Sequence, residues 1–327
     1  MKIKKLVPLL ALVMGISAFG GCTNNDQKII FTPLWNEHSN ADKEVFNETL
    51  TYGVTFESSE SSFVNYTLDY KDGVYTTNLV GEVVNGELVY TYTTALSITP
   101  LFTFEGKTTD PELIDTVTSE VKFKATNYGL QPISSKKSLV NHTPMGSNVT
   151  ALEECYRYYH YTLETTYLND CTSGKTVITS YPLKEDGTAD TPIEKTNEFE
   201  IDQDKFSYLD NEQLLAAVRC IRNATTSAKV NVYSPFVDTV QKVSVTFNAD
   251  ASKEFTLNGE AKTITYRPVS IVLDEQNSGA TQTAWFAKYE EVNGVNKNRN
   301  VMLHLETPLS YSLGIMKYTL QSMSYTK

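Results

Sequence analysis

Apolar side chains recur at every second position through most of this 327-residue sequence. Leu50, Tyr52 and Val54 alternate with polar residues, and the same period of two returns in the runs that begin at Val64 and Leu88. Successive side chains of a strand point to opposite faces, so this period gives one apolar face and one polar face. The pattern predicts half-buried β-strands, and no alternation of strands with helices accompanies it.

Turn signals separate these runs. Asp72-Gly73, Asn85-Gly86 and Asn258-Gly259 are dipeptides that favour the tight turn of a β-hairpin, because their residues tolerate a positive φ. Their positions predict a meander in which each hairpin pairs with the next. We therefore expect an all-β fold built on an antiparallel meander sheet.

One helix is expected among the strands. Asp210 can cap its N-terminus, and Gln213 stands three residues later as in a capping box. An apolar stripe follows at helical spacing, formed by Leu214, Val218 and Ile221. Two cations lie near the C-terminal end, Arg219 and Arg222. This pattern predicts an amphipathic helix that packs across one face of the sheet.

The first 21 residues have the parts of an export signal. Three lysines precede an apolar stretch over residues 6–19, which is shorter than the ~20 residues that a membrane-spanning helix needs. Phe19-Gly20-Gly21-Cys22 follows and resembles the lipobox of bacterial lipoproteins. The alternative is an ordinary secretory signal with a cysteine there by chance.

The lipobox resemblance implies a location. Residues 1–21 would be a lipoprotein signal peptide, and Cys22 would become the N-terminus and carry acyl chains such as palmitate. The protein would be exported and anchored at the outer face of the cytoplasmic membrane, or in the periplasm or outer membrane of a cell with two membranes. The membrane is then a partner through the lipid anchor.

The remaining chain is expected to divide simply. Residues 22–45 lack an apolar pattern and predict a tether. Residues 46–327 predict one β-rich domain, either undivided or with lobes over 46–200 and 201–327. Three further cysteines, an odd number, are expected to be buried thiols: Cys155, Cys171 and Cys220.

Charge excludes one class of partner. The chain has a net charge of −11, and because three of its lysines lie in the leader, the charge beyond residue 21 is −14. An acidic chain of this kind matches neither nucleic acid nor an anionic lipid surface.

Several segments resemble an uncharacterised family of exported bacterial proteins. They are an Asp-led helix ending near Arg (206–219), a strand containing Trp285, and a last hairpin over 300–320. The family is similar in fold to the half-barrel of the lipoprotein carriers LolA and LolB. The resemblance covers roughly 206–327 and 48–80, and it implies a curved half-barrel sheet with a helix near its concave side. It brings no catalytic residues.

The sequence contains no recognised catalytic or metal-binding motif, so neither a cofactor nor a metal site is expected. The histidines are isolated from one another in sequence: His38, His142, His160 and His304. The run Tyr156–Tyr161 is either a stacking surface or the two faces of one strand. Trp285 is the candidate ligand-binding residue, and it would either line a cavity or plug the core beneath the helix.

Three functions are compatible with the sequence. The first is a non-enzymatic, membrane-anchored module that binds an apolar or lipid-like ligand in its concave sheet. The second is a structural or interaction lipoprotein that contacts protein or glycan of the cell envelope, and the third is a hydrolase, for which no motif stands. A cavity lined by Leu, Val and Phe would favour the first, and a filled sheet with an exposed Tyr patch the second.

Overall fold

A computed structural model describes residues 31–33, 35–36, 44–60, 62–110, 112–126, 129–168, 171–184, 187–201, 208–221, 226–273, 281–293 and 295–327. The expected signal peptide over 1–21 and the expected lipidation site Cys22 lie outside these residues. Within the described ranges, none of the helices has the length and apolar character that crossing a membrane requires.

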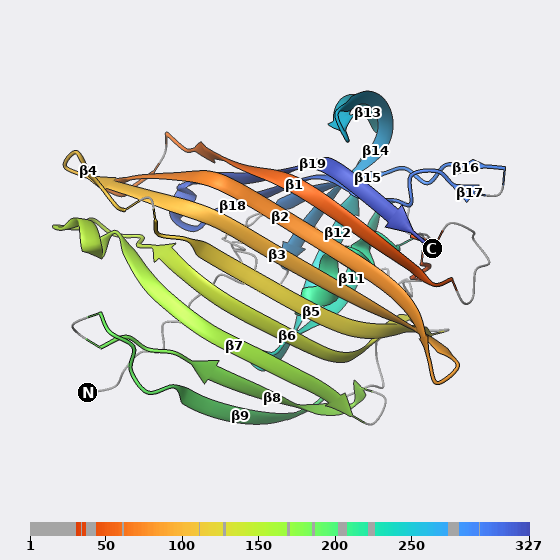
Figure 1. Cartoon of the computed structure of the whole chain (residues 1–327), viewed down its shortest axis with the longest axis horizontal. Coiled ribbons are helices and arrows are strands. Elements are labelled where there is room, and N and C mark those ends of the chain that lie inside the picture. The colour runs from red at the N-terminus through yellow and green to blue at the C-terminus, as the bar shows by residue number, and fades with distance from the viewer. Residues whose placement is uncertain are drawn as a thin grey trace.

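Most of the described chain forms one large curved sheet, which confirms the all-β fold class (Figure 1). Its strands are β1 (Phe46–Ser58), β2 (Thr67–Val84), β3 (Glu87–Phe104), β4 (Lys107–Thr108), β5 (Asp115–Thr126), β6 (Gly129–Pro144), β7 (Tyr156–Leu168), β8 (Ser173–Ser180), β9 (Ile193–Glu200), β10 (Tyr208–Asp210), β11 (Ser227–Ser234), β12 (Thr239–Phe247), β13 (Ala251–Leu257), β14 (Glu260–Leu273), β15 (Gln282–Ala287), β18 (Met302–Pro308) and β19 (Gly314–Thr326). A separate small hairpin joins β16 (Glu291–Val292) to β17 (Val295–Asn296).

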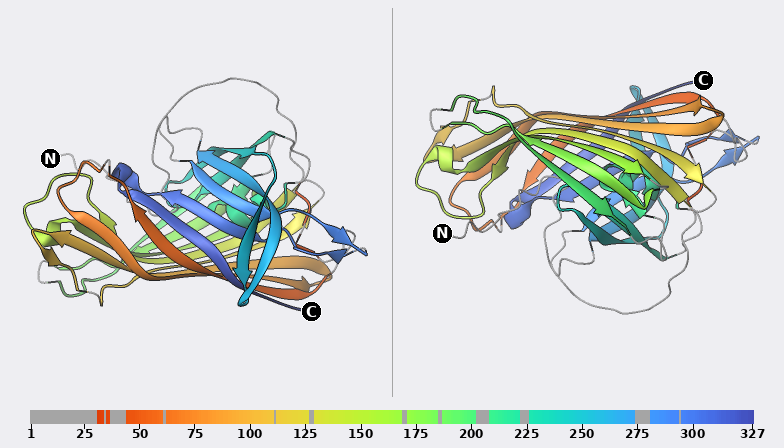
Figure 2. Two further views of the ribbon diagram at one scale, coloured as in Figure 1. Left: turned by 90° about the horizontal axis from the view of Figure 1, so that it is seen from above. Right: turned by 90° about the horizontal axis from the view of Figure 1, so that it is seen from below.

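The strands pair mainly with their neighbours in sequence. β1 joins the two halves, because it pairs with β2 on one side and with β19 on the other. The pairs are antiparallel, as the meander predicts, except that β10 runs parallel to β11. The sheet curls so that the strands around β7 to β9 approach those around β10 and β11 (Figure 2).

The alternating pattern and two of the three turn signals are confirmed. Leu50, Tyr52 and Val54 are buried along β1. Asn85-Gly86 and Asn258-Gly259 connect hairpins, with positive φ at all four residues. Asp72-Gly73 is wrong as a turn, because β2 continues through it and shows a register shift against β3 at that point. The dipeptide forms a bulge instead, because the residues of β2 before it and after it both pair with β3.

The predicted helix is present but shorter and more deeply buried than expected. Asp210 forms the capping box with Gln213, which starts a 3₁₀ turn over Asn211–Gln213. The α-helix α1 then spans only Leu214–Val218, and every one of its residues is buried. The expectation of an amphipathic helix is therefore wrong, because α1 is apolar on all sides and packs within the main core. Arg222 lies outside the described residues.

Part of the expected tether belongs to the folded domain. Phe31 forms a β-bridge with Ile221, and Trp35 is 0% exposed. The Trp35 ring lies edge-on to the rings of Tyr90 and Phe123, with centroids 5.1 and 6.0 Å away. The interpretation of all of 22–45 as a tether is thus wrong for residues 31–33 and 35–36. Phe31 and Trp35 stand in a short apolar run that has neither the strand nor the helix period, and their partners lie far along the chain.

The two expected lobes share one core. The main apolar cluster includes Leu50 and Tyr90 from the first half, and Val243 and Ile271 from the second. α1 packs in the same cluster. Residues 46–200 and 201–327 therefore build a common interior.

Candidate functional site

A polar cluster closes the seam of the curled sheet, where β6 and β7 meet β10. Asp210, at the end of β10, is 0% exposed. Its Oδ2 accepts hydrogen bonds from the hydroxyls of Ser135 and Tyr167 at 2.6 and 2.5 Å. Its Oδ1 accepts one from the backbone N–H of Glu212 at 2.8 Å. One carboxylate thus ties together β6, β7 and the start of the helical segment.

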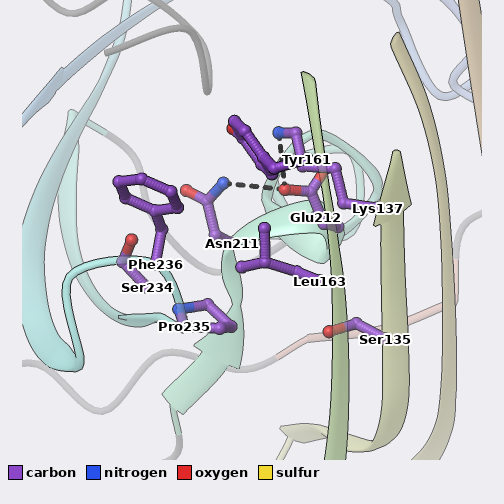
Figure 3. A pocket seen from close by; sticks show the side chains of 9 residues that line it. All are labelled: Ser135, Lys137, Tyr161, Leu163, Asn211, Glu212, Ser234, Pro235 and Phe236. Atoms are coloured by element: carbon purple, nitrogen blue, oxygen red, sulfur yellow. Dashed lines mark hydrogen bonds and ion pairs between the residues drawn. The ribbon is translucent and has the colours of Figure 1, made fainter. Parts of the chain in front are cut away.

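A small pocket lies beside this cluster (Figure 3). Lys137 and Glu212 face each other there, with Nζ and Oε1 2.9 Å apart, and both side chains are largely buried. The cavity of about 20 Å³ has room for about one water molecule. Its lining comes from β6, β7, the 3₁₀ turn and the β11–β12 turn: Ser135, Lys137, Tyr161, Leu163, Asn211, Glu212, Ser234, Pro235 and Phe236.

Burial sets the electrostatics of the seam. Desolvation raises the pKa of Asp210 to about 6, although the hydrogen bonds from Ser135 and Tyr167 work in the opposite direction. Burial also disfavours the ammonium of Lys137, but Glu212 together with Tyr161 and Asp210 outweighs it and raises the pKa of Lys137. Lys137 and Glu212 compensate each other's charge, whereas Asp210 is held by two hydroxyls and a backbone N–H, and both groups join segments across the seam.

A second buried pair joins a carboxylate to a histidine. Asp115 is 1% exposed, and its Oδ1 lies 2.7 Å from Nδ1 of His142. Oδ2 accepts a hydrogen bond from the side-chain amide of Asn141 at 2.8 Å. Burial raises the pKa of Asp115, while His142 lowers it in part. In the described part of the chain, no three His, Cys, Asp or Glu side chains gather as a metal site.

A third buried cluster joins one carboxylate to two guanidinium groups. The guanidinium of Arg219 donates to both carboxylate oxygens of Glu48 at 2.7 and 2.9 Å, and Nε of Arg299 donates to one of them at 2.9 Å. Arg299 also stacks on the rings of Phe46 and Tyr325. The cluster fastens the end of α1 to the first strand and to the turn before β18.

Sequence reasoning missed these clusters, although one signal was present. Glu48 has the same parity as Leu50 and Tyr52, so the period of two already placed it on the buried face of β1. Ser135 and Lys137 likewise share a face with buried Leu139. Their partners lie far along the chain, for example 171 residues away for Glu48 and Arg219, and no local pattern reveals such pairs.

Trp285 lies half-buried in an aromatic ladder across neighbouring strands. Its ring stacks on Tyr266 at 4.8 Å and contacts His304 at 4.3 Å, and Nζ of Lys253 lies 5.2 Å from its centroid. These partners belong to β14, β18 and β13, and none belongs to α1. Trp285 does not line the pocket of Figure 3, and its role in ligand binding stays a prediction.

The three cysteines of the domain are buried, as predicted. They form no disulfide with one another: Cys155, Cys171 and Cys220.

The tyrosine run of β7 covers both faces of the strand. Tyr161 is buried, whereas Tyr158 and His160, on the opposite face, are partly exposed. The ring of His160 stacks on Tyr181, with centroids 4.3 Å apart and planes at 24°. Burial lowers the pKa of His160, which keeps the ring neutral at neutral pH.

Hydroxyl side chains continue this face. Thr162 follows His160 on the same side of β7 and pairs in register with Ser138 of β6 and Thr179 of β8. All three are partly exposed. We call the set an aromatic–hydroxyl face, and its members are Tyr158, His160, Tyr181, Ser138, Thr162 and Thr179.

Comparison with protein family models, with curated proteins and with solved structures finds no match for this chain. The resemblance to an exported bacterial family, and through it to LolA and LolB, therefore stays a prediction.

Proposed function

We propose that this protein is an exported, lipid-anchored binding protein that contacts a neutral glycan of the cell envelope through its aromatic–hydroxyl face. The observation that carries the proposal is the filling of the concave side of the sheet. α1 and Trp35 pack there against inward-facing aromatic residues such as Tyr90 and Phe123. With the interior occupied, binding at an outer surface is favoured over binding of an acyl chain inside.

The chemistry of the face suits a sugar chain. Aromatic rings with polar tips pack against the C–H faces of sugars while the tips form hydrogen bonds. Tyr158, His160 and Tyr181 supply such rings, and the threonine and serine hydroxyls beside them supply donors and acceptors. The charges near this face are matched, as in the Lys136–Glu164 ion pair, and the net charge of the chain is −11. A neutral polymer fits better than a polyanion.

Location supports an envelope role. The lipobox-like Phe19-Gly20-Gly21-Cys22 would place the domain outside the cytoplasmic membrane, where structural polysaccharides are exposed. Glu48 and Lys137 form buried ion pairs with Arg219 and Glu212, and we propose binding without catalysis.

One observation keeps the apolar-ligand function as a second candidate. Side chains such as Asp210 and Ser135 hold the seam between β10 and β6 together, whereas the backbone of β10 pairs with β11. A sheet closed by side chains can open at lower cost than one closed by a backbone ladder. An apolar ligand would have to enter by this route and displace core residues.

The test compares binding of one soluble domain, residues 26–327, to two kinds of ligand. We expect it to co-sediment with insoluble neutral envelope polysaccharide, and the double variant Tyr158→Ala/His160→Ala to lose at least tenfold in affinity. Thr166→Ala, exposed on the same strand and face, is the matched control and should bind as the wild type does. Saturable binding of a fluorescent fatty acid without polysaccharide binding would reverse the choice between the two functions.

A further inference from the structure

The chain enters the folded domain close to its expected lipid anchor. Phe31 pairs with Ile221, and the backbone N–H of Thr32 donates to the carbonyl of Cys220 at 2.9 Å. Nine residue steps separate Cys22 from Phe31. Even fully extended, this linker spans at most about 30 Å. The lipidated residue therefore lies within about 30 Å of Phe31.

The sheet is longer than this linker. β2 and β3 each contain 18 residues, which at about 3.3 Å per residue gives about 60 Å. Residues 31–33 and 35–36 lie toward the end where β1 starts and where β2 turns into β3 (Figure 1). Trp35 contacts Tyr90, which pairs in register with Gly81 near that turn. We call this the entry end. Because the linker is shorter than the sheet, the opposite end of the sheet cannot be the end that lies against the membrane.

The entry end carries exposed apolar side chains. Val45 is 53% exposed, and Val83 and Val84 at the β2–β3 turn are 44% and 42% exposed. Phe46 pairs with Gly81, so Val45 precedes β1 beside the residues that lead into this turn. The turn itself is a tight Asn-Gly pair that projects beyond the paired sheet. Valines at a projecting tip bury little apolar surface within the protein, and transfer into an apolar phase would lower their free energy.

We propose that the entry end faces the bilayer and that Val45, Val83 and Val84 seat in the interfacial region of a phospholipid surface. This orientation rests on the proposed lipid anchor at Cys22. The length of the linker selects this end, and the exposed valines give it an apolar surface for the contact. The chain is acidic, with a net charge of −11, so the contact is apolar and needs no anionic lipid.

The most exposed large apolar side chain lies elsewhere and serves as the control. Phe63 is 84% exposed in the β1–β2 connection, at the opposite end of the sheet. If exposure alone decided membrane contact, Phe63 would be the inserted residue. Because the linker holds the entry end at the membrane, we expect Phe63 to lie in water.

The experiment uses full-length lipidated protein in phosphatidylcholine vesicles. The variants Val84→Cys and Phe63→Cys each receive a polarity-sensitive fluorophore, and the native thiols Cys155, Cys171 and Cys220 are buried and should label poorly. We expect the probe at position 84 to shift to the blue and to be quenched severalfold by nitroxide lipids. The probe at position 63 should report water and resist quenching.

Two results would overturn the orientation in distinguishable ways. If the protein floats with the vesicles while the probe at position 84 stays as exposed as in delipidated protein, the anchor stands and the orientation is wrong. If the protein does not float, the lipid anchor fails and the orientation fails with it. Quenching at position 63 without quenching at 84 would select the opposite end.

Discussion

Acidification from pH 8 to pH 5 should stabilise the folded domain through Asp210. Burial raises the pKa of this carboxyl from 3.8 to about 6, so the folded state prefers the protonated form. The stabilisation is fully present below pH 3.8 and is lost as the pH rises through about 6. Two pKa units correspond to about 3 kcal/mol in total, of which about 1.4 kcal/mol appears between pH 8 and pH 5.

The groups around Asp210 leave this signal readable. The pKa values of Tyr167, Tyr208 and Tyr233 are raised by burial, and that of Lys137 is raised by Glu212, so these four groups keep their protonation state over this range. Asp115, whose pKa burial also raises, contributes with the same sign elsewhere. The contribution of Asp210 is therefore taken as the difference between the wild type and Asp210→Asn.

The assay is urea unfolding of residues 26–327 at pH 5, 6, 7 and 8, followed by tryptophan fluorescence. Asp210→Asn should reduce the gain in stability on acidification by about 1.4 kcal/mol. Asp250→Asn is the control, because ion pairs with Lys288 and Arg267 outweigh burial and lower the pKa of Asp250, which moves its titration below the range. An unchanged pH dependence in Asp210→Asn would refute the reasoning.

Three further variants test the packing by urea unfolding. Glu48→Gln should cost about 3–5 kcal/mol, because it leaves Arg219 and Arg299 buried with less compensating charge; a loss below 1 kcal/mol would mean that the cluster is solvated. Trp35→Ala should cost about 3–5 kcal/mol, whereas a residue of a flexible tether would cost nothing. Leu214→Ala should cost about 2–5 kcal/mol, and a variant that unfolds like the wild type would place α1 outside the core.

The strands were predictable because their information is local. A period of two and an Asn-Gly dipeptide are read within a few residues, and both describe β1 and the β2–β3 turn correctly. Asp72-Gly73 carries the same local signal but forms a bulge, because pairing of β2 with β3 on both sides decides its conformation. That pairing depends on residues that a short window does not contain.

The candidate sites were less predictable because they depend on closure of the sheet. The aromatic–hydroxyl face contains Tyr158 and His160 of the tyrosine run that the sequence singled out, yet Ser138 lies on β6, Thr179 lies on β8 and Tyr181 follows β8. Asp210 was identified as a helix cap, and its capping role is correct. Its bonds to Ser135 and Tyr167 cross the seam, which exists only in the folded sheet.

Native mass spectrometry of residues 26–327, purified without detergent, tests most directly the claim that the interior of the sheet is filled. The account predicts the mass of the polypeptide alone, with no apolar adduct, because α1 and Trp35 occupy the concave side of the sheet. A stoichiometric lipid or fatty acid that survives transfer to the gas phase would contradict it.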